Sequence, residues 1–287
     1  MFVMIHLRKK HLFVAARAFF ALLLLAAAYR VVAGQSAVSK ALPFSQGEQL
    51  VYQAEFKRAL LRGVDVAEFR FSATTERVHS RGASGDDPIV VRLVGDVVTK
   101  GLFLKLVGFH FHEHVESVVD PSPFTALRTN KLEEQGKRAW TSEAVFDHQA
   151  RKVTWTVRDS NQTQAVQTSS VEFSEPIQDV LTVIYFLRTV PLEVGKSFDI
   201  PLSDSGGVFR FSVAVLERKQ INTVLGRLSA VRVEPSLFGE NGLVRKRGTL
   251  SIWITEDSRH LPIKAQLKVD IGTFDIKLKR VSYREAH

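Results

Sequence analysis

Apolar and polar residues alternate with a period of two along most of the chain. Each alternating segment places apolar side chains on one face and Thr, Lys, Arg or Glu on the other. The clearest segments are 50–57, 67–71, 152–158, 250–254 and 274–279. This pattern is typical of an antiparallel sheet with one solvated face, because parallel sheets need continuous apolar runs and crossover helices.

One segment, residues 178–188 (QDVLTVIYFLR), follows a helical period instead. The apolar positions at helical spacing are Val180, Val183, Ile184 and Leu187. Further apolar residues make the segment apolar almost all round, which is typical of a buried helix. Asp179 suits the N-terminal cap, and Pro191 ends the helix. We expect this helix to lie on the concave face of a curved sheet, as a plug or a lid. A buried strand is the alternative, but the segment is long for one.

These patterns predict an all-β, mainly antiparallel fold: a curved sheet or partly open β-barrel with one buried helix. Short polar turns interrupt the strands, and none is long enough to be an interdomain linker. They lie at 82–88, 121–123, 203–207 and 239–242. We therefore expect a single antiparallel β domain over residues 44–284, after a linker over 34–43.

Residues 1–33 have the features of a signal peptide. A basic leader precedes an apolar run at 18–28, which is shorter than the roughly 20 residues of a membrane-spanning helix. Small residues at the peptidase positions predict cleavage after Ala33. The mature protein is then periplasmic or secreted, with no integral membrane span. The alternative is an uncleaved anchor, which Arg30 disfavours because it interrupts the apolar run.

Composition narrows the function classes. The chain has no cysteine, which excludes disulfide scaffolds, cysteine-ligated metal centres, thiol nucleophiles and a lipid-anchored lipoprotein. The leader carries five basic and no acidic residues, so the net charge falls from +9 for the whole chain to +4 for the mature chain. Charges of both signs alternate along that chain, and the one basic run is the short cluster 245–247. No nucleic-acid partner is expected.

The strongest candidate for chemistry is the segment 109–114 (FHFHEH). In a strand its three histidines share one face, and His-x-His strands build zinc sites. His110 and His112 would lie about 6.6 Å apart, close enough to share an ion, whereas His114 would lie about 13 Å from His110. A third ligand would have to come from elsewhere. We favour the alternative of a solvated polar face opposite Phe109 and Phe111, because no second zinc motif accompanies the histidines.

Other catalytic signals are missing. The sequence has no nucleophile elbow, phosphate-binding loop, dinucleotide fingerprint or zinc-protease motif. Neighbouring acids, such as Glu113 with Glu116 or Glu256 with Asp257, are typical of solvated sheet faces. We predict no catalytic residues, no cofactor and no metal, and the ligand-binding residues stay unassigned.

Several stretches occur in a recognisable order along nearly the whole mature chain. They are 43–52 (PFSQGEQLVY), 116–120 (ESVVD), 145–147 (VFD), 179–188 (DVLTVIYFLR) with 194–195 (VG), and 252–257 (IWITED) with 261–263 (LPI). Together they resemble the exported bacterial domain-of-unknown-function family numbered 3108. The resemblance implies a signal-bearing envelope protein of Gram-negative-type bacteria with a mostly antiparallel β fold. It implies no catalytic or binding residues.

Three functions follow from these features. The first is a non-enzymatic periplasmic binding or carrier protein for an apolar ligand such as a lipid, held between sheet and helix. The excess of Phe over Tyr and Trp favours it over a sugar-binding protein. The second is a structural or assembly protein of the cell envelope that acts through protein–protein contacts. The third and least favoured is a metal-dependent enzyme at His110 and His112.

Overall fold

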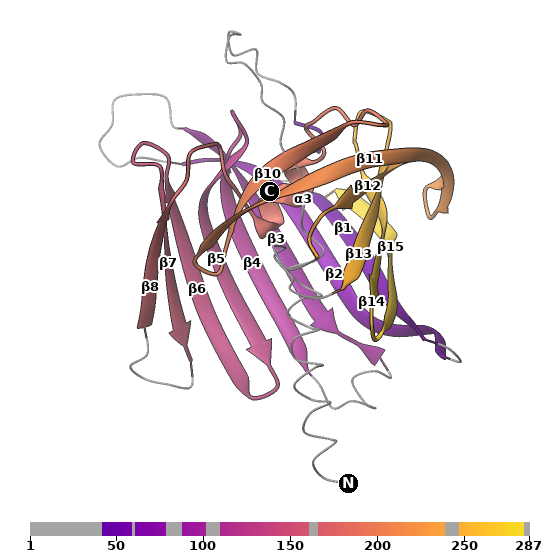
Figure 1. Cartoon of the computed structure of the whole chain (residues 1–287), viewed down its shortest axis with the longest axis horizontal. Helices are drawn as coiled ribbons and strands as arrows, with labels where there is room; N and C mark the ends of the chain where they lie inside the picture. The colour runs from indigo at the N-terminus through magenta and orange to yellow at the C-terminus, as the bar shows by residue number, and fades with distance from the viewer. Residues whose placement is uncertain are drawn as a thin grey trace.

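The computed structural model describes residues 42–58, 61–78, 88–101, 110–160, 166–238 and 247–283. The predicted signal peptide, nearly all of the predicted linker and the 239–242 turn lie outside the described residues. The described residues form a 15-stranded sheet with a helix on its inner face (Figure 1). Among them, no helix combines the length and the apolar content needed to cross a membrane.

The strands follow one another along the chain, with the helix between the ninth and the tenth. The first eight are β1 (Glu48–Arg58), β2 (Leu61–Arg77), β3 (Ile89–Thr99), β4 (Phe111–Asp120), β5 (Thr125–Gln135), β6 (Arg138–Asp147), β7 (Lys152–Asp159) and β8 (Val166–Glu172). The remaining elements are β9 (Gln178–Asp179), α3 (Val180–Phe186), β10 (Ser197–Asp204), β11 (Gly207–Thr223), β12 (Gly226–Pro235), β13 (Gly248–Thr255), β14 (Pro262–Val269) and β15 (Gly272–Tyr283).

The sheet consists of two antiparallel meanders that meet where β1 pairs with β15. One meander runs from β1 outwards to β8, and the other runs from β15 back to β9, so that β8 and β9 are the two edges. The two-residue strand β9 pairs with β10 in parallel, in contrast to the other strand pairs. The predicted fold class is therefore confirmed: a large, mainly antiparallel sheet that does not close into a barrel.

Register shifts bend the sheet, because each one adds local twist to a strand. They fall at Val51/Tyr52, Ala54/Glu55, Phe56/Arg58, Val118/Val119, Val215/Glu217 and Trp253/Ile254. The bend brings the two ends of the sheet together, where separate hydrogen bonds replace strand pairing. The amide of Ala126 donates to the carbonyl of Ile177 at 3.3 Å, and Trp155 Nε1 donates to Ser203 Oγ at 2.7 Å.

The helix α3 is shorter than the predicted segment 178–188. Asp179 is the N-cap, as expected, and its carboxylate accepts a hydrogen bond from the Thr182 amide at 2.8 Å. Because the cap residue has extended backbone, Gln178 and Asp179 pair with β10 as a strand instead of starting the helix. The four residues expected on the buried side of the helix are all buried, which confirms that part of the prediction: Val180, Val183, Ile184 and Leu187.

Two apolar clusters divide the sheet into regions of unequal size. We call the larger region the body: α3 with β1–β4 and β10–β15. The smaller region, the wing, consists of β5–β8, whose strands lie side by side in Figure 1. In the body, Gly95 of β3 lets the helix approach closely, since a Cβ atom there would lie 3.2 Å from Leu181 Cδ1. The wing cluster holds Ala126, Ala144, Phe146, Val153, Trp155, Phe173 and Ile177.

Candidate functional site

The histidines singled out from the sequence lie on the outer face of β4 or just before it. His110 is exposed, and His112 and His114 are partly buried, while Phe111 faces the core. His112 Nδ1 lies 2.7 Å from Glu134 Oε2, and His114 Nδ1 lies 2.8 Å from an oxygen of Asp96. In the described ranges, no group of three or more His, Asp or Glu residues has an arrangement that would hold a metal ion. The metal site at His110 and His112 stays a hypothesis.

A buried arginine lies where the helix, the first strand and a hairpin meet. Arg188 follows α3, and its side chain is fully buried. Its Nη1 donates to Glu48 Oε1 at 2.5 Å and its Nη2 to Glu48 Oε2 at 3.0 Å. Nη2 also donates to the carbonyl of Pro43, and Nε donates to the carbonyl of Arg259. Such a bidentate pair with further carbonyl acceptors leaves little of the guanidinium unsatisfied.

Aromatic rings enclose the same guanidinium. The ring centroids of Phe44 and Tyr185 lie 5.7 and 5.4 Å from it, within the range of cation–π contacts. Burial lowers the pKa of Arg188, but the hydrogen bonds and charge of Glu48 outweigh burial and raise it above its ordinary value. Arg188 therefore joins three of the motif-like stretches of the sequence: the opening stretch, the helix and the closing hairpin.

A second buried ionic group lies at the junction of body and wing. Lys131 of β5 places its Nζ 3.4 Å from Glu113 Oε1, 3.8 Å from Glu133 Oε2 and 3.8 Å from Asp204 Oδ1. We call these four residues the junction cluster. Three carboxyl groups face one ammonium, and Glu113 Oε1 has no hydrogen-bond partner. With all three carboxyl groups ionised the cluster has a net charge of −2, and protonation of one of them reduces this to −1.

Among the three carboxyl groups, that of Glu113 binds the proton. Burial raises the pKa of its carboxyl group to about 8, with Glu133 and Asp204 adding to the shift and Lys131 opposing it. Burial lowers the pKa of Lys131, but the three carboxyl groups outweigh burial and hold it above its ordinary value. The cluster therefore stores a proton on Glu113 at neutral pH. Shifted pKa values also occur in purely structural networks, so they do not by themselves define an active site.

An apolar cavity lies between α3 and the sheet, where the sequence places a ligand groove. Its volume is about 30 Å³. It is lined by Tyr52, Phe71, Ile184, Leu187, Ile252, Pro262, Lys264, Ala265 and Ile276. A cavity of this size is comparable to the space of one water molecule and far below the roughly 300 Å³ of a small-molecule pocket.

A larger hollow of about 370 Å³ lies over β1–β3 and β15. Its lining is mainly polar and consists of Gln49, Leu50, Val51, Arg70, Phe71, Ser72, Val94, Asp96 and Arg280. Two of its charged residues already have partners, because Arg70 pairs with Glu68 and Asp96 with His114. The hollow is therefore a shallow depression in the surface of the sheet and not a ligand pocket.

The edge strand β8 is the most accessible strand of the structure. Six of its seven residues are exposed, and it pairs with β7 alone. The other edge, β9, has only two residues, both buried, and Gln178 of β9 donates to the carbonyl of Phe124. An accessible edge presents unpaired backbone N–H and C=O groups that bind another strand. Its sequence, VQTSSVE, shows no alternation of apolar and polar residues and therefore does not predict a strand.

The model of a family of proteins of unknown function, DUF3108, matches residues 51–279. The chain belongs to the DUF3108 family. The match runs from β1 into β15 and so covers both the body and the wing of this DUF3108 protein. It confirms the family resemblance drawn from the motif-like stretches.

One solved structure shares the fold of this DUF3108 protein. The chain is similar to a β-barrel-like protein of the domain of unknown function DUF1849 from Brucella abortus, with a TM-score of 0.50 and 9% identity over 83% of this chain and 98% of that chain. A putative exported protein with a YmcC-like fold from Bacteroides fragilis aligns with a TM-score of 0.34 and 7% identity, over 84% of this chain and 98% of that chain. At 9% identity, the first likeness shows the fold alone. No curated protein matches the chain.

Proposed function

We propose that this DUF3108 protein is a non-enzymatic protein of the cell envelope that acts by binding another protein along its exposed edge strand, β8. The observation that carries the proposal is the contrast between the two edges of one sheet: β9 is short and buried, and β8 is longer and exposed. Natural sheets usually protect such an edge with charges, proline or a covering segment. The basic, apolar leader supports export to the periplasm, where envelope partners are available.

The alternative, a carrier for an apolar ligand, is favoured by one specific observation. The space between α3 and the sheet is lined almost entirely by apolar residues, and α3 is only seven residues long. A shift of this short helix would enlarge the space into a groove. The present volume of about 30 Å³ favours the helix as a plug, and therefore favours protein binding over ligand transport.

Site-specific crosslinking in the native envelope tests the proposed function. A photoreactive residue at Thr168, on the outer face of β8, is expected to capture one stoichiometric protein partner. The same probe at Thr156, one strand further in on the same face, is the matched control and is expected not to capture it. If both positions give the same faint, non-stoichiometric products, the edge binds no protein and the proposal is wrong.

The substitution Ile184→Asp distinguishes two roles of helix α3: a plug that fills the core, or a lid that covers a ligand groove. Ile184 is 8% exposed, so a buried unpaired carboxylate is expected to cost several kcal/mol and to unfold the domain or expose it to proteolysis. Thermal denaturation and protease sensitivity measure this. A stable, soluble variant that has lost binding of an apolar probe would make α3 a lid and favour the carrier. Lipid co-purified from the native envelope would support the same reading.

A further inference from the structure

The residues of β8 have an unusual composition for an exposed edge. The strand reads VQTSSVE and contains no lysine, no proline and no charged residue before Glu172. In Figure 1 it forms the outer margin of the wing, with β7 on its inner side. Short polar and β-branched side chains of this kind fit closely against a second strand of the same composition. The strand itself therefore lacks the charges and the proline that normally prevent strand pairing between molecules, and the β10–β11 turn approaches it at Ser169, through Gly206.

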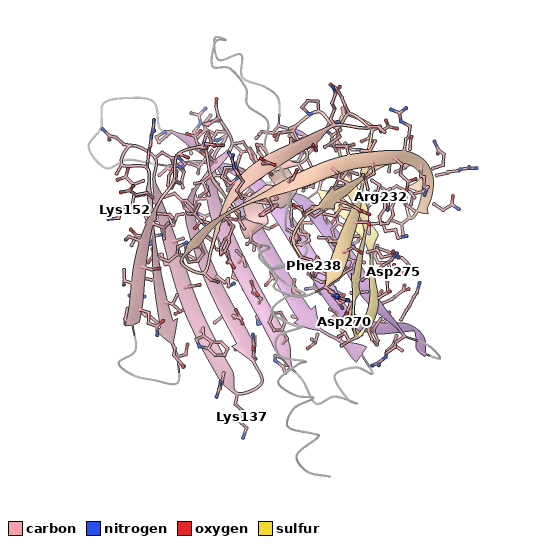
Figure 2. The ribbon with its side chains drawn as sticks, in the orientation of Figure 1. Lys137, Lys152, Arg232, Phe238, Asp270 and Asp275 are labelled. Carbon is pink, nitrogen blue, oxygen red and sulfur yellow. The ribbon has the colours of Figure 1, made fainter. Side chains whose placement is uncertain are left out.

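Two charged residues lie at opposite ends of this edge. Arg158 of β7 is paired in register with Val166 at one end, and Glu172 lies at the other end. Both are exposed, and neither forms an ion pair with any residue in the described part of the chain. Lys152 is opposite Glu172 in register, at the outer margin of the molecule in Figure 2, but no ion pair joins the two. The positive and negative ends are thus available to a partner.

An antiparallel copy of β8 complements this arrangement. A two-fold axis at Ser169, the midpoint of the strand, pairs all seven residues of β8 with those of a second copy. Val166 then lies opposite Glu172 of the second copy, and Arg158 is one strand further in on the same face. The opposite charges come within about 10 Å of each other, twice, by symmetry. A parallel arrangement would instead place like charges together.

We propose that β8 pairs with β8 of a second copy of this chain, antiparallel about a two-fold axis at Ser169, so that the two sheets join into one. This inference rests on the proposed function and names its partner. The edge contact is small, so the dimer is expected to be concentration-dependent. The backbone hydrogen bonds provide the affinity, while the arginine and glutamate set the register and the antiparallel direction.

The absence of cysteine from the sequence makes the register directly testable. In the proposed dimer, Ser169 lies opposite itself, with Cα atoms about 4.5–5.5 Å apart, which suits a disulfide. Ser169→Cys is therefore expected to give a covalent dimer under mild oxidation. Thr168→Cys and Ser170→Cys report a two-fold axis displaced by one residue, which changes the register by two residues, and Thr156→Cys in β7 is the matched control that stays monomeric.

Charge variants test the same pairing without crosslinking. Thr168 lies opposite Ser170 of the second copy, so the double variant Thr168→Lys/Ser170→Lys places lysines opposite lysines. We expect its dimer dissociation constant to rise at least tenfold in analytical ultracentrifugation, with unchanged circular dichroism and thermal stability. Arg158→Glu alone is expected to weaken the dimer at low salt, and Arg158→Glu/Glu172→Arg is expected to restore it.

The outcomes separate this inference from the proposed function. A wild-type protein that stays monomeric at high concentration, with Ser169→Cys no more reactive than Thr156→Cys, overturns the self-pairing. If the probe at Thr168 then captures a different envelope protein, the proposed function stands with another partner. If it captures nothing, both are wrong. A dimer that survives the lysine substitutions also overturns the inference, because it uses another surface.

Discussion

The body and the wing are parts of one sheet, but they are held together in different ways. The body contains α3 and a large apolar cluster, and its buried arginine links elements that are distant in sequence. The wing has a cluster of only seven residues, and its last strand is exposed. Because apolar burial contributes about 25 cal/mol per Å², the body holds most of the stabilising free energy. The wing depends more on hydrogen bonds at its boundary.

This difference suggests a division of roles. A region with few apolar contacts and an exposed edge opens locally at a lower free energy than a densely packed region. In this protein, such a region also carries the surface that we propose for binding. The body then serves as the rigid support that positions the wing, and single substitutions should affect the two regions differently.

The largest effect is expected in the body, for Arg188→Met. The substitution leaves the buried carboxylate of Glu48 without its partner, which costs about 3–5 kcal/mol. Urea denaturation followed by circular dichroism measures the change. The additional substitution Glu48→Gln is expected to recover part of the loss. The exposed pair Arg218–Glu256 is the control, and Arg218→Met should cost less than about 1 kcal/mol. Equal costs for the two arginine variants would contradict this account of the body.

A smaller effect is expected at the boundary of the wing, for Trp155→Phe. The change removes the hydrogen bond from the indole to Ser203 of β10, which is worth about 1 kcal/mol. Hydrogen exchange should become faster in β6–β8 and stay unchanged in β1 and β15. Trp253→Phe in the body is the control, because the indole nitrogen of Trp253 has no hydrogen-bond partner. Faster exchange across the whole sheet would mean that the wing does not open separately.

The junction cluster predicts a pH dependence of stability. The pKa of Glu113 is about 8 in the folded protein, against 4.5 for an ordinary glutamate, so the folded state binds more protons than the unfolded state between these values. The free energy of unfolding therefore falls as the pH rises from 5 to 8. We expect Tm to fall by roughly 7–14 °C over this range, since the shift corresponds to about 3.5 kcal/mol and 1 kcal/mol corresponds to about 2–4 °C.

Variants assign this pH dependence to one side chain. Glu113→Gln keeps the shape of the protonated acid, so it should flatten the fall in Tm and be more stable than the wild type at pH 8. Glu116→Gln, on the outer face of the same strand, should keep the fall. A fall that is equally steep in Glu113→Gln would place the titrating group elsewhere.

The smallest effect is expected on the outer face, for His114→Ala. His114 and its partner Asp96 are both more than a third exposed, so the substitution should change the free energy of unfolding by less than about 1 kcal/mol. Chemical denaturation at pH 7 measures it. Elemental analysis of the purified protein tests the metal hypothesis independently: stoichiometric zinc that is lost in His112→Ala would revive it.

The sequence predicted the fold class and the buried helix because both depend on local periodicity. Alternating apolar residues identified β1 and β7, and Asp179 marked the start of α3. The strand β8 escaped detection for a physical reason. A strand that is exposed on both faces has no apolar side, so it shows no period of two.

The candidate sites were harder to predict from the sequence. Glu113 was interpreted as a solvated acid, although its position alternates with the histidines and shares the face of the buried Phe111. Because Glu113 lies two positions after Phe111, the sequence itself indicated that this carboxyl group is buried. The pairing of Arg188 with Glu48 spans 140 positions in the sequence, and no local pattern encodes it. Long-range pairs of this kind follow from the topology, which periodicity does not determine.

The pairing of β1 with β15 has a consequence for how the protein is made. The meander from β1 to β8 is built from consecutive hairpins, so its pairing partners emerge one after another during synthesis. The edge of β1 opposite β2, however, stays unpaired until β15 is made, and that strand lies more than 220 residues later in the sequence. Until that strand arrives, the apolar face of the body is uncovered and vulnerable to aggregation. Completion of the fold is therefore coupled to delivery of the last strand, and a chaperone has its greatest effect in that interval.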